Sequence, residues 1–85
     1  MVAADQTGSN VLVDVKAPWW ASRLKVTVTN GAPVVVQLMY KAAGVDSLFD
    51  QIPVGEGRSY SLEGVEFVQI FSSGISVISN SFHVR

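Results

Sequence analysis

The sequence predicts an all-β domain, a small antiparallel β-sandwich or barrel of six to seven short strands. Apolar and polar residues alternate strictly over residues 23–29, which is typical of a strand with one buried face. Short apolar runs recur along the chain, and Gly, Pro, Asn and Ser separate them as turn residues do. No window long enough to count has the 3.6-residue periodicity of an amphipathic helix.

The size and composition limit how this domain is stabilised. Its 85 residues fit one domain, with no cysteine for disulfides and only one histidine, so we expect neither a zinc site nor a cofactor. Hydrophobic residues make up 48% of the chain and charged residues only 15%, where about 25% charged is typical. Since a small domain is mostly surface, either uncharged polar side chains cover it or an assembly hides part of it.

The first part of the chain divides into an arm and a strand. Residues 1–9 are small and polar, and they predict a flexible arm ahead of a single sandwich domain at residues 10–85. The arm is either a disordered terminus or a segment that becomes ordered on a neighbouring subunit. The alternating Val11, Val13 and Val15 indicate a first strand, which Pro18 ends by removing a backbone donor.

The second and third strands are expected at residues 23–29 and 34–40. Asn30-Gly31 between them tolerates positive φ, which predicts a tight hairpin. The third strand is apolar on both faces, with Val35 and Met39 opposite the remaining apolar residues of the run. A strand of this kind must be covered on both sides. The sequence leaves open which face meets the domain's own core, because a slip of one residue exchanges the two.

The longest break in alternation is the connection at residues 41–57. It is either a structured crossover between two sheets or a functional loop. Within it, Asp46 is a candidate cap for one helical turn over residues 46–50, with Leu48 and Phe49 packed inward. Its acidic residues, Asp46, Asp50 and Glu56, have no calcium-loop spacing, and a solvated loop explains them.

The last third of the chain predicts three further strands. They are expected at residues 58–62, 65–71 and 75–78, and residues 80–85 either continue the last one after a bulge or form a seventh strand. Ser72-Ser73-Gly74 is a candidate hairpin loop with glycine at the positive-φ position. Residues 65–71 are apolar on two sides, with Val68 and Ile70 on one of them.

The sequence contains no recognisable catalytic set. His83 is the only histidine, and no Gly-x-Ser-x-Gly elbow occurs. Gly55-Glu56-Gly57 resembles part of a dinucleotide fingerprint, but a third glycine and a following helix are missing. We therefore expect a protein that is not an enzyme.

The charges and hydropathy argue against two other classes of partner. Six basic and seven acidic residues give a net charge of −1 without a basic cluster, so we expect no nucleic-acid binding. No apolar stretch approaches 18 residues, so we expect no membrane span. The first nine residues lack the charged and apolar regions of a signal peptide, which predicts a protein made in the cytoplasm.

Trp19-Trp20 is the constellation that fits recognition best, because an exposed indole can anchor a protein contact or stack on a sugar. The alternative is that both indoles close an open end of the sandwich. If the chain is extended there, one indole points inward and the other outward.

The order of these features is similar to that of small virion proteins of bacteriophages. The resemblance lies in the polar arm, Val-x-Val-x-Val at residues 11–15, Asn30-Gly31, the proline–glycine corner before Tyr60-Ser-Leu62, and the run at residues 67–77. It spans most of the chain and carries over no functional residue. It implies a β-rich capsid, decoration or tail component that forms homo-oligomers on a larger shell or fibre.

Two functional hypotheses follow. The first is a non-enzymatic structural subunit of a symmetric homo-oligomeric assembly, such as a virion, whose partners are copies of itself and a larger protein assembly. The second is a sandwich module that binds carbohydrate with Trp19, Trp20 or Tyr40. The residues we expect at contacts with other copies are Trp19, Trp20, Val35, Met39, Val68 and Ile70.

Overall fold

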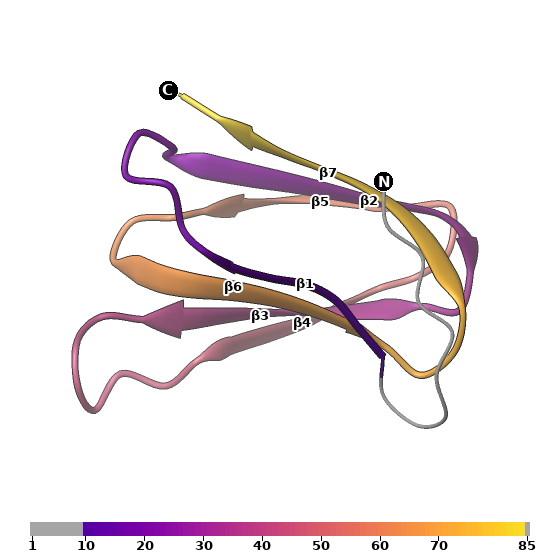
Figure 1. The fold of residues 1–85 in the computed structure, drawn as a ribbon, viewed down its shortest axis with the longest axis horizontal. Helices are drawn as coiled ribbons and strands as arrows, with labels where there is room; N and C mark the ends of the chain where they lie inside the picture. The colour runs from indigo at the N-terminus through magenta and orange to yellow at the C-terminus, as the bar shows by residue number, and fades with distance from the viewer. Residues whose placement is uncertain (1–9, 85) are drawn as a thin grey trace.

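Seven strands form two antiparallel sheets packed face to face in this computed structural model, which describes residues 10–84 (Figure 1). The strands are β1 (Asn10–Lys16), β2 (Arg23–Gly31), β3 (Val34–Tyr40), β4 (Leu48–Ile52), β5 (Gly57–Ser61), β6 (Val65–Ser72) and β7 (Ser76–His83). One sheet has the order β1-β6-β3-β4 and the other β5-β2-β7. The predicted all-β sandwich is therefore confirmed, while the predicted arm at residues 1–9 lies outside the described residues.

The core lies between the sheets and is built from the alternating residues of their central strands. On β2 these are Leu24, Val26 and Val28, all fully buried. On β3 and β6 the fully or almost fully buried residues are Val34, Val36, Leu38, Val68 and Ile70. Burial of an aliphatic side chain of this size stabilises the fold by about 1.5–3 kcal/mol. The strict alternation of residues 23–29 thus marks the face of β2 that packs against β3 and β6.

The expected hairpin between β2 and β3 is wrong, because the two strands belong to different sheets. Asn30-Gly31 instead lies where the chain turns from one sheet to the other. Gly31 has φ 91° there, and no residue other than glycine among the described ones has positive φ. A Cβ on Gly31 would lie 2.1 Å from the Ile75 carbonyl oxygen, so the β6–β7 loop leaves no room for a side chain. The sequence predicted that this position needs glycine for its positive φ. The lack of space for a side chain is a second reason why it must be glycine.

The expected helical turn at residues 46–50 is also wrong, because β4 occupies this part of the chain. β4 pairs antiparallel with β3, with Val34 opposite Ile52 and Leu38 opposite Leu48. Only Ile52 is buried, and Leu48 and Phe49 are exposed. Pairing with the open edge of β3 thus outweighs the local signal for a helical cap.

β7 is one continuous strand as far as His83, without the expected break near Asn80. The irregularity lies on the partner strand, where the register shifts between Val28 and Asn30 of β2. The expected positive φ of Gly74 is not observed. The turn is stabilised differently, because Ser72 Oγ accepts a hydrogen bond from the Gly74 backbone N–H at 3.2 Å.

Two polar contacts connect the sheets across the core. Ser76 Oγ donates to the Ala32 carbonyl at 2.6 Å and is hydrogen-bonded to Ser72 Oγ, with both serine side chains buried. At another edge, the Tyr60 hydroxyl of β5 donates to Asp50 Oδ2 of β4 at 2.7 Å. Burial, and then this hydrogen bond, raise the pKa of Tyr60 well above its ordinary value. The phenol therefore stays protonated and holds β5 to β4.

Candidate functional site

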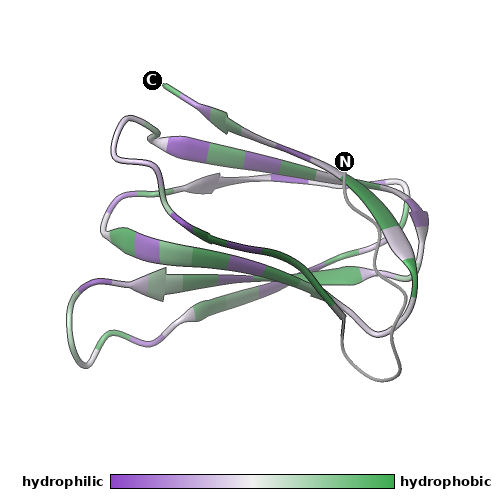
Figure 2. Cartoon of the chain, viewed as in Figure 1, coloured by the Kyte–Doolittle hydropathy of each residue, from purple (hydrophilic) through white to green (hydrophobic). Residues whose placement is uncertain are grey.

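The outer faces of the two sheets differ in chemistry. On the three-stranded sheet the outward residues of β2 are Arg23, Lys25, Thr27 and Thr29, and those of β5 and β7 include Ser59, Ser61, Ser79 and Ser81. On the four-stranded sheet, aliphatic and aromatic side chains occupy many of the outward positions. In Figure 2, β3 is mostly green along its length, whereas β2 is banded in green and purple. The molecule therefore has one polar and one apolar side.

We call the outward apolar residues of the four-stranded sheet the apolar face. They are Val11 on β1, Phe67 and Phe71 on β6, Val35 and Met39 on β3, and Phe49 on β4. Val11, Phe49 and Phe67 are 50%, 64% and 38% exposed, and the other three are half-buried. Apolar patches of this kind, rimmed by polar residues, mark interaction sites on globular proteins.

The strand register arranges this apolar face in rows. Phe71 lies between Val11 and Val35, and Phe67 lies beside Met39. A row of polar residues divides the two apolar rows, in which Gln69 of β6 pairs with Gln37 of β3. Lateral neighbours on one face of a sheet lie close enough for their side chains to pack. Each apolar row is therefore continuous between β6 and β3, and the row that contains Phe71 also reaches β1.

The charged residues of this face all lie on one strand. Asp14 pairs with Gln69, and Lys16 pairs with Phe67, so both point outward from β1. One acid and one base two positions apart leave this edge of the apolar face with no net charge.

The predicted contact residues are divided between this face and the core. Val35 and Met39 belong to the apolar face, on the side of β3 away from the core. Val68 and Ile70 do not, because they pair with the inward residues Leu38 and Val36 and are fully buried. Placing Val68 and Ile70 at contacts with another copy was therefore wrong. Both faces of β6 are apolar, so the sequence pattern could not distinguish the core side from the outer side.

Trp19 and Trp20 lie at the tip of a turn, not in extended chain. The Ala21 N–H donates to the Pro18 carbonyl at 3.1 Å and closes this turn. Trp19 is 95% exposed and Trp20 45% exposed, so neither indole closes the end of the sandwich. Ala17 and Ala21 pack against the core in their place.

The tryptophan turn is anchored on both sides to the chain around β6. The Ala17 N–H donates to the Glu66 carbonyl at 2.8 Å, and the Leu62 N–H donates to the Ser22 carbonyl at 3.0 Å. In Figure 1 the turn lies at the end of the sandwich where β6 begins and β3 ends. That is also the end of the sheet where Phe67 and Met39 lie side by side. The exposed indoles therefore lie at the same end of the sandwich as Phe67 and Met39, on the turn that connects β1 to β2.

Several residues of the apolar face were missed from the sequence. Phe67 and Phe71 carried a usable signal, since they lie on the opposite side of the strand from Val68 and Ile70. Phe49 carried none, because its segment was expected to be helical and only the pairing with β3 turns it outward. Val11 was hidden by a register shift between Val11 and Val13 on β1.

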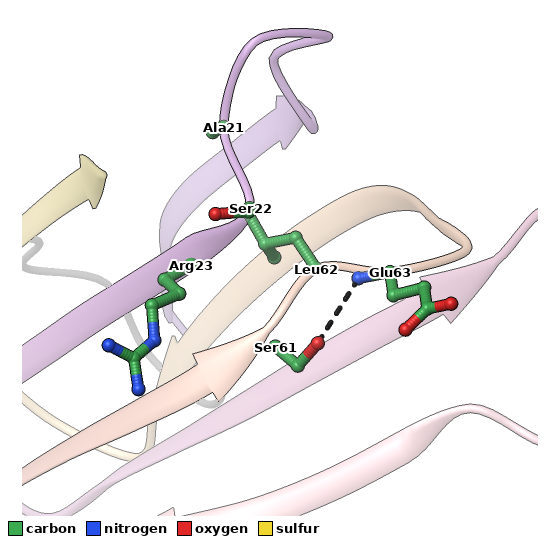
Figure 3. Close-up of a pocket in the computed structure, with 6 residues that line it drawn as sticks. All are labelled: Ala21, Ser22, Arg23, Ser61, Leu62 and Glu63. Atoms are coloured by element: carbon green, nitrogen blue, oxygen red, sulfur yellow. Dashed lines mark hydrogen bonds between the residues drawn. The ribbon is translucent and has the colours of Figure 1, made fainter. Parts of the chain in front are cut away.

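A hollow of about 790 Å³ lies at the tryptophan end of the sandwich. Ala21, Ser22, Arg23, Ser61, Leu62 and Glu63 line it (Figure 3). The Glu63 N–H donates to Ser61 Oγ at 3.4 Å, and the Arg23 and Glu63 side chains point away from each other. Ser22 Oγ is enclosed and has no hydrogen-bond partner within the described chain. The hollow thus has polar groups on its wall that do not converge on one point.

Residues 10–84 contain neither a cluster that could bind a metal ion nor a helix that could span a membrane. In this range no three His, Asp or Glu side chains gather where they could hold a metal ion. The same residues form no helix long and apolar enough to cross a membrane.

Comparison with known proteins adds no relative. No protein family model matches the chain, and neither a curated protein nor a solved structure matches it. The fold and the surface therefore define the class by themselves: a seven-stranded β-sandwich with one apolar outer face.

Proposed function

We propose that this protein is a non-enzymatic structural subunit of a symmetric homo-oligomer, in which the apolar face packs against the same face of a second copy. The observation that carries this proposal is the contrast between the two sheets. The three-stranded sheet has the outer surface of a solvated sandwich, whereas the four-stranded sheet exposes Phe49 and Phe67. An exposed sheet face of this composition is an aggregation hazard unless a specific partner covers it.

The size of the apolar face supports a specific contact. Strands lie about 4.8 Å apart and rise about 3.3 Å per residue, so four strands of about seven residues have a flat footprint of about 450 Å². Two such footprints total about 900 Å², and side-chain relief adds to the accessible area. A specific interface buries about 1,000 Å² or more in total. With that relief, the outer face of the four-stranded sheet, which carries the apolar face, reaches this range.

The polar groups on the face support a second copy as its partner. A two-fold axis brings the same patch of both subunits together, so the patch must complement itself. Asp14 and Lys16 on β1 allow opposite charges to meet across such an axis. Gln37 and Gln69 carry both donors and acceptors, so two copies can satisfy each other's amides.

A larger assembly is the second part of the proposal. The sequence resemblance to small bacteriophage virion proteins supports a role as a capsid, decoration or spike component. Trp19, left 95% exposed, suits a contact with that larger particle, because tryptophan is enriched at the centres of protein interfaces. Trimers or pentamers of the isolated protein would support a shell or a spike, but they would contradict the two-fold contact between apolar faces.

The decisive experiment compares charged substitutions on the two outer faces by sedimentation equilibrium. Val35→Arg places a charge in the middle of the apolar face, where Val35 is half-buried and points away from the core. Ser59→Arg adds the same charge to the polar side at an exposed position on β5. We expect Val35→Arg to weaken self-association at least about tenfold, a change of about 1.4 kcal/mol or more. Ser59→Arg should leave it unchanged, and equal effects of the two would refute the contact.

Carbohydrate binding is the second candidate, and the exposure of the tryptophan turn favours it. Trp19 offers a free ring face for a sugar to stack on, whereas Tyr40 is partly buried against the core. Tryptophan fluorescence separates the two candidates. A red-shifted spectrum that does not change on dilution would favour the sugar-binding module, whereas a spectrum that shifts to the red on dilution supports the assembly.

A further inference from the structure

Within the part of the chain that the structure describes, one side of the β7 backbone has no strand paired with it. Within residues 10–84 this strand is hydrogen-bonded only to β2. The Ala32 N–H donates to the Ile75 carbonyl and the Ser22 N–H to the His83 carbonyl, both at 3.0 Å. Because the direction of the backbone groups alternates along a strand, odd-numbered residues of β7 face β2. The residues that direct N–H and C=O to the open edge are Ser76, Ile78, Asn80 and Phe82.

The other three edge strands carry features that oppose pairing with another chain. β1 has Asp14 and Lys16 and an irregular register. β4 has only five residues, includes Asp50 and is followed by Pro53. β5 also has five residues and includes Arg58. Charges, short length, bulges and proline are the known ways in which sheet edges are protected.

β7 has none of these features. It is eight residues long and contains no Asp, Glu, Lys, Arg or Pro. The register shift of its ladder falls on β2, so β7 itself is regular. Its outward side chains at Ser79 and Ser81 are small and exposed. Figure 1 shows β7 along the rim of the molecule, opposite the sheet edge formed by β4.

We propose that β7 pairs antiparallel with β7 of a second copy, about a two-fold axis at Ser79, and joins two three-stranded sheets into one of six strands. This inference deepens the proposed function and rests on it in naming a second copy as the partner. It adds a second contact, distinct from the apolar face, and a subunit with two different self-contacts can build an extended assembly.

The alternation of backbone groups selects this register. With Ser79 opposite Ser79, Ile78 of each copy lies opposite Asn80 of the other, and Ser76 lies opposite Phe82. All four residues that direct their N–H and C=O groups to the open edge then form hydrogen-bonded pairs. A register with Asn80 opposite Asn80 leaves Ser76 unpaired, so it satisfies fewer backbone groups.

The composition of the edge favours a second copy over a different partner. Two-fold pairing places the residue at the axis opposite its own equivalent, and like charges directly opposite each other destabilise a sheet. An edge without charged residues avoids this repulsion. A two-fold axis perpendicular to the sheet also makes the paired strands antiparallel, as they are throughout both sheets of this molecule.

Single cysteines test the register directly, because the chain has no native cysteine. Ser79→Cys places one sulfur of each copy at the two-fold axis. The two Cα atoms there lie about 4.5 Å apart, within the range of a disulfide. The matched variant Ser81→Cys is equally exposed on the same strand face. In the proposed register its two copies are offset by four residues, about 13 Å along the strand, which is too far for a disulfide.

We expect most of the Ser79→Cys protein to form a disulfide-linked dimer under mild oxidation, and Ser81→Cys to remain largely unlinked. We expect the Ser79 link to persist when Val35→Arg is added, since that substitution affects only the apolar face. Equal linking of both variants would overturn the register. If Ser79→Cys stays unlinked while the wild-type protein self-associates, the edge contact is overturned and the apolar face remains the contact. If the wild-type protein is also monomeric, both proposals fail.

Ser79→Lys provides an independent measurement that needs no oxidation. It places two lysines opposite each other at the axis, so we expect the dissociation constant of the edge contact to rise about tenfold or more. Ser59→Lys, on the same face of the same sheet but on β5, is the control for the added charge. Sedimentation of both variants in the Val35→Arg background isolates the edge contact. Equal dissociation of the two variants would contradict the proposal.

Discussion

Single residues decide how the two sheets are held in place. Gly31 allows the β2–β3 corner to pass against the β6–β7 loop, and Tyr60 connects β5 to β4 through Asp50. These positions differ in how far the sequence revealed them. The need for positive φ at Gly31 was predicted from Asn30-Gly31, whereas the Tyr60–Asp50 bond joins residues of two strands whose proximity depends on the whole fold.

Gly31→Ala should be among the most destabilising substitutions at a glycine of this chain. The new Cβ would lie 2.1 Å from the Ile75 carbonyl oxygen, at a φ of 91° that alanine rarely adopts. We expect a loss of unfolding free energy of more than about 2 kcal/mol in urea titrations. Gly55→Ala is the matched control, because its φ is 89° but nothing lies within 4 Å of the added Cβ. Equal losses would show that crowding at Gly31 is unimportant.

Tyr60→Phe should remove the bond between the sheet edges. The substitution leaves the part-buried Asp50 carboxylate without its phenol donor, and hydrogen bonds to charged groups contribute about 1.5–3 kcal/mol. We expect a loss at the lower end of this range, measured by chemical unfolding at pH 7. The control is Tyr40→Phe, since no hydrogen bond of the Tyr40 hydroxyl occurs within the described residues. A loss no larger than that of the control would argue against the contact.

Stability should also fall at alkaline pH through Tyr60. Its pKa is raised in the folded state by burial and by the bond to Asp50, and it is about 10 in the unfolded chain. The unfolded state therefore loses its proton first, so the stabilisation is complete below pH 10 and is lost as the pH rises above 10. Unfolding free energies at pH 8 and pH 11 should differ more for the wild type than for Tyr60→Phe. An identical pH dependence of the two proteins would contradict this assignment.

Individual elements show where local sequence patterns were sufficient. β2 was predictable because Leu24, Val26 and Val28 alternate with polar residues. β3 and β6 were predictable as strands, but their core faces were not, since both sides of each are apolar. β4 was missed because its five residues have no alternation and become a strand through pairing with β3. Half of the residues of the apolar face lie on β6 and β4, whose outward sides were not recognised from the sequence. This explains why only Val35 and Met39 of the apolar face were predicted.

The β6–β7 hairpin offers a test at the scale of elements. Ser76 Oγ contacts both Ser72 Oγ and the Ala32 carbonyl, so it ties the hairpin to the corner between the sheets. Ser76→Ala removes one hydrogen bond each from the buried Ser72 Oγ and the Ala32 carbonyl, and we expect a loss of about 1–3 kcal/mol in thermal or chemical unfolding. Ser73→Ala in the same loop, at an exposed position, should change stability by less than about 0.5 kcal/mol. Equal losses would contradict the role of Ser76.

At the scale of the whole molecule, the sandwich encloses its own core but leaves one outer sheet face apolar. The compositional excess of hydrophobic residues predicted such an uncovered surface, yet composition cannot locate it. Its position on β1, β6, β3 and β4 depends on strand order, which residues far apart in the sequence determine together. The β7 edge likewise has no sequence signal, because an edge exists only once both sheets are assembled.

The mass of the wild-type protein in solution tests the central claim most directly. Light scattering after size separation, at micromolar concentration, should give a multiple of the 9.1 kDa mass of one chain. A dimer or a higher oligomer agrees with an apolar face covered by a second copy. A monodisperse species of 9.1 kDa, unchanged over the concentration range, would contradict it.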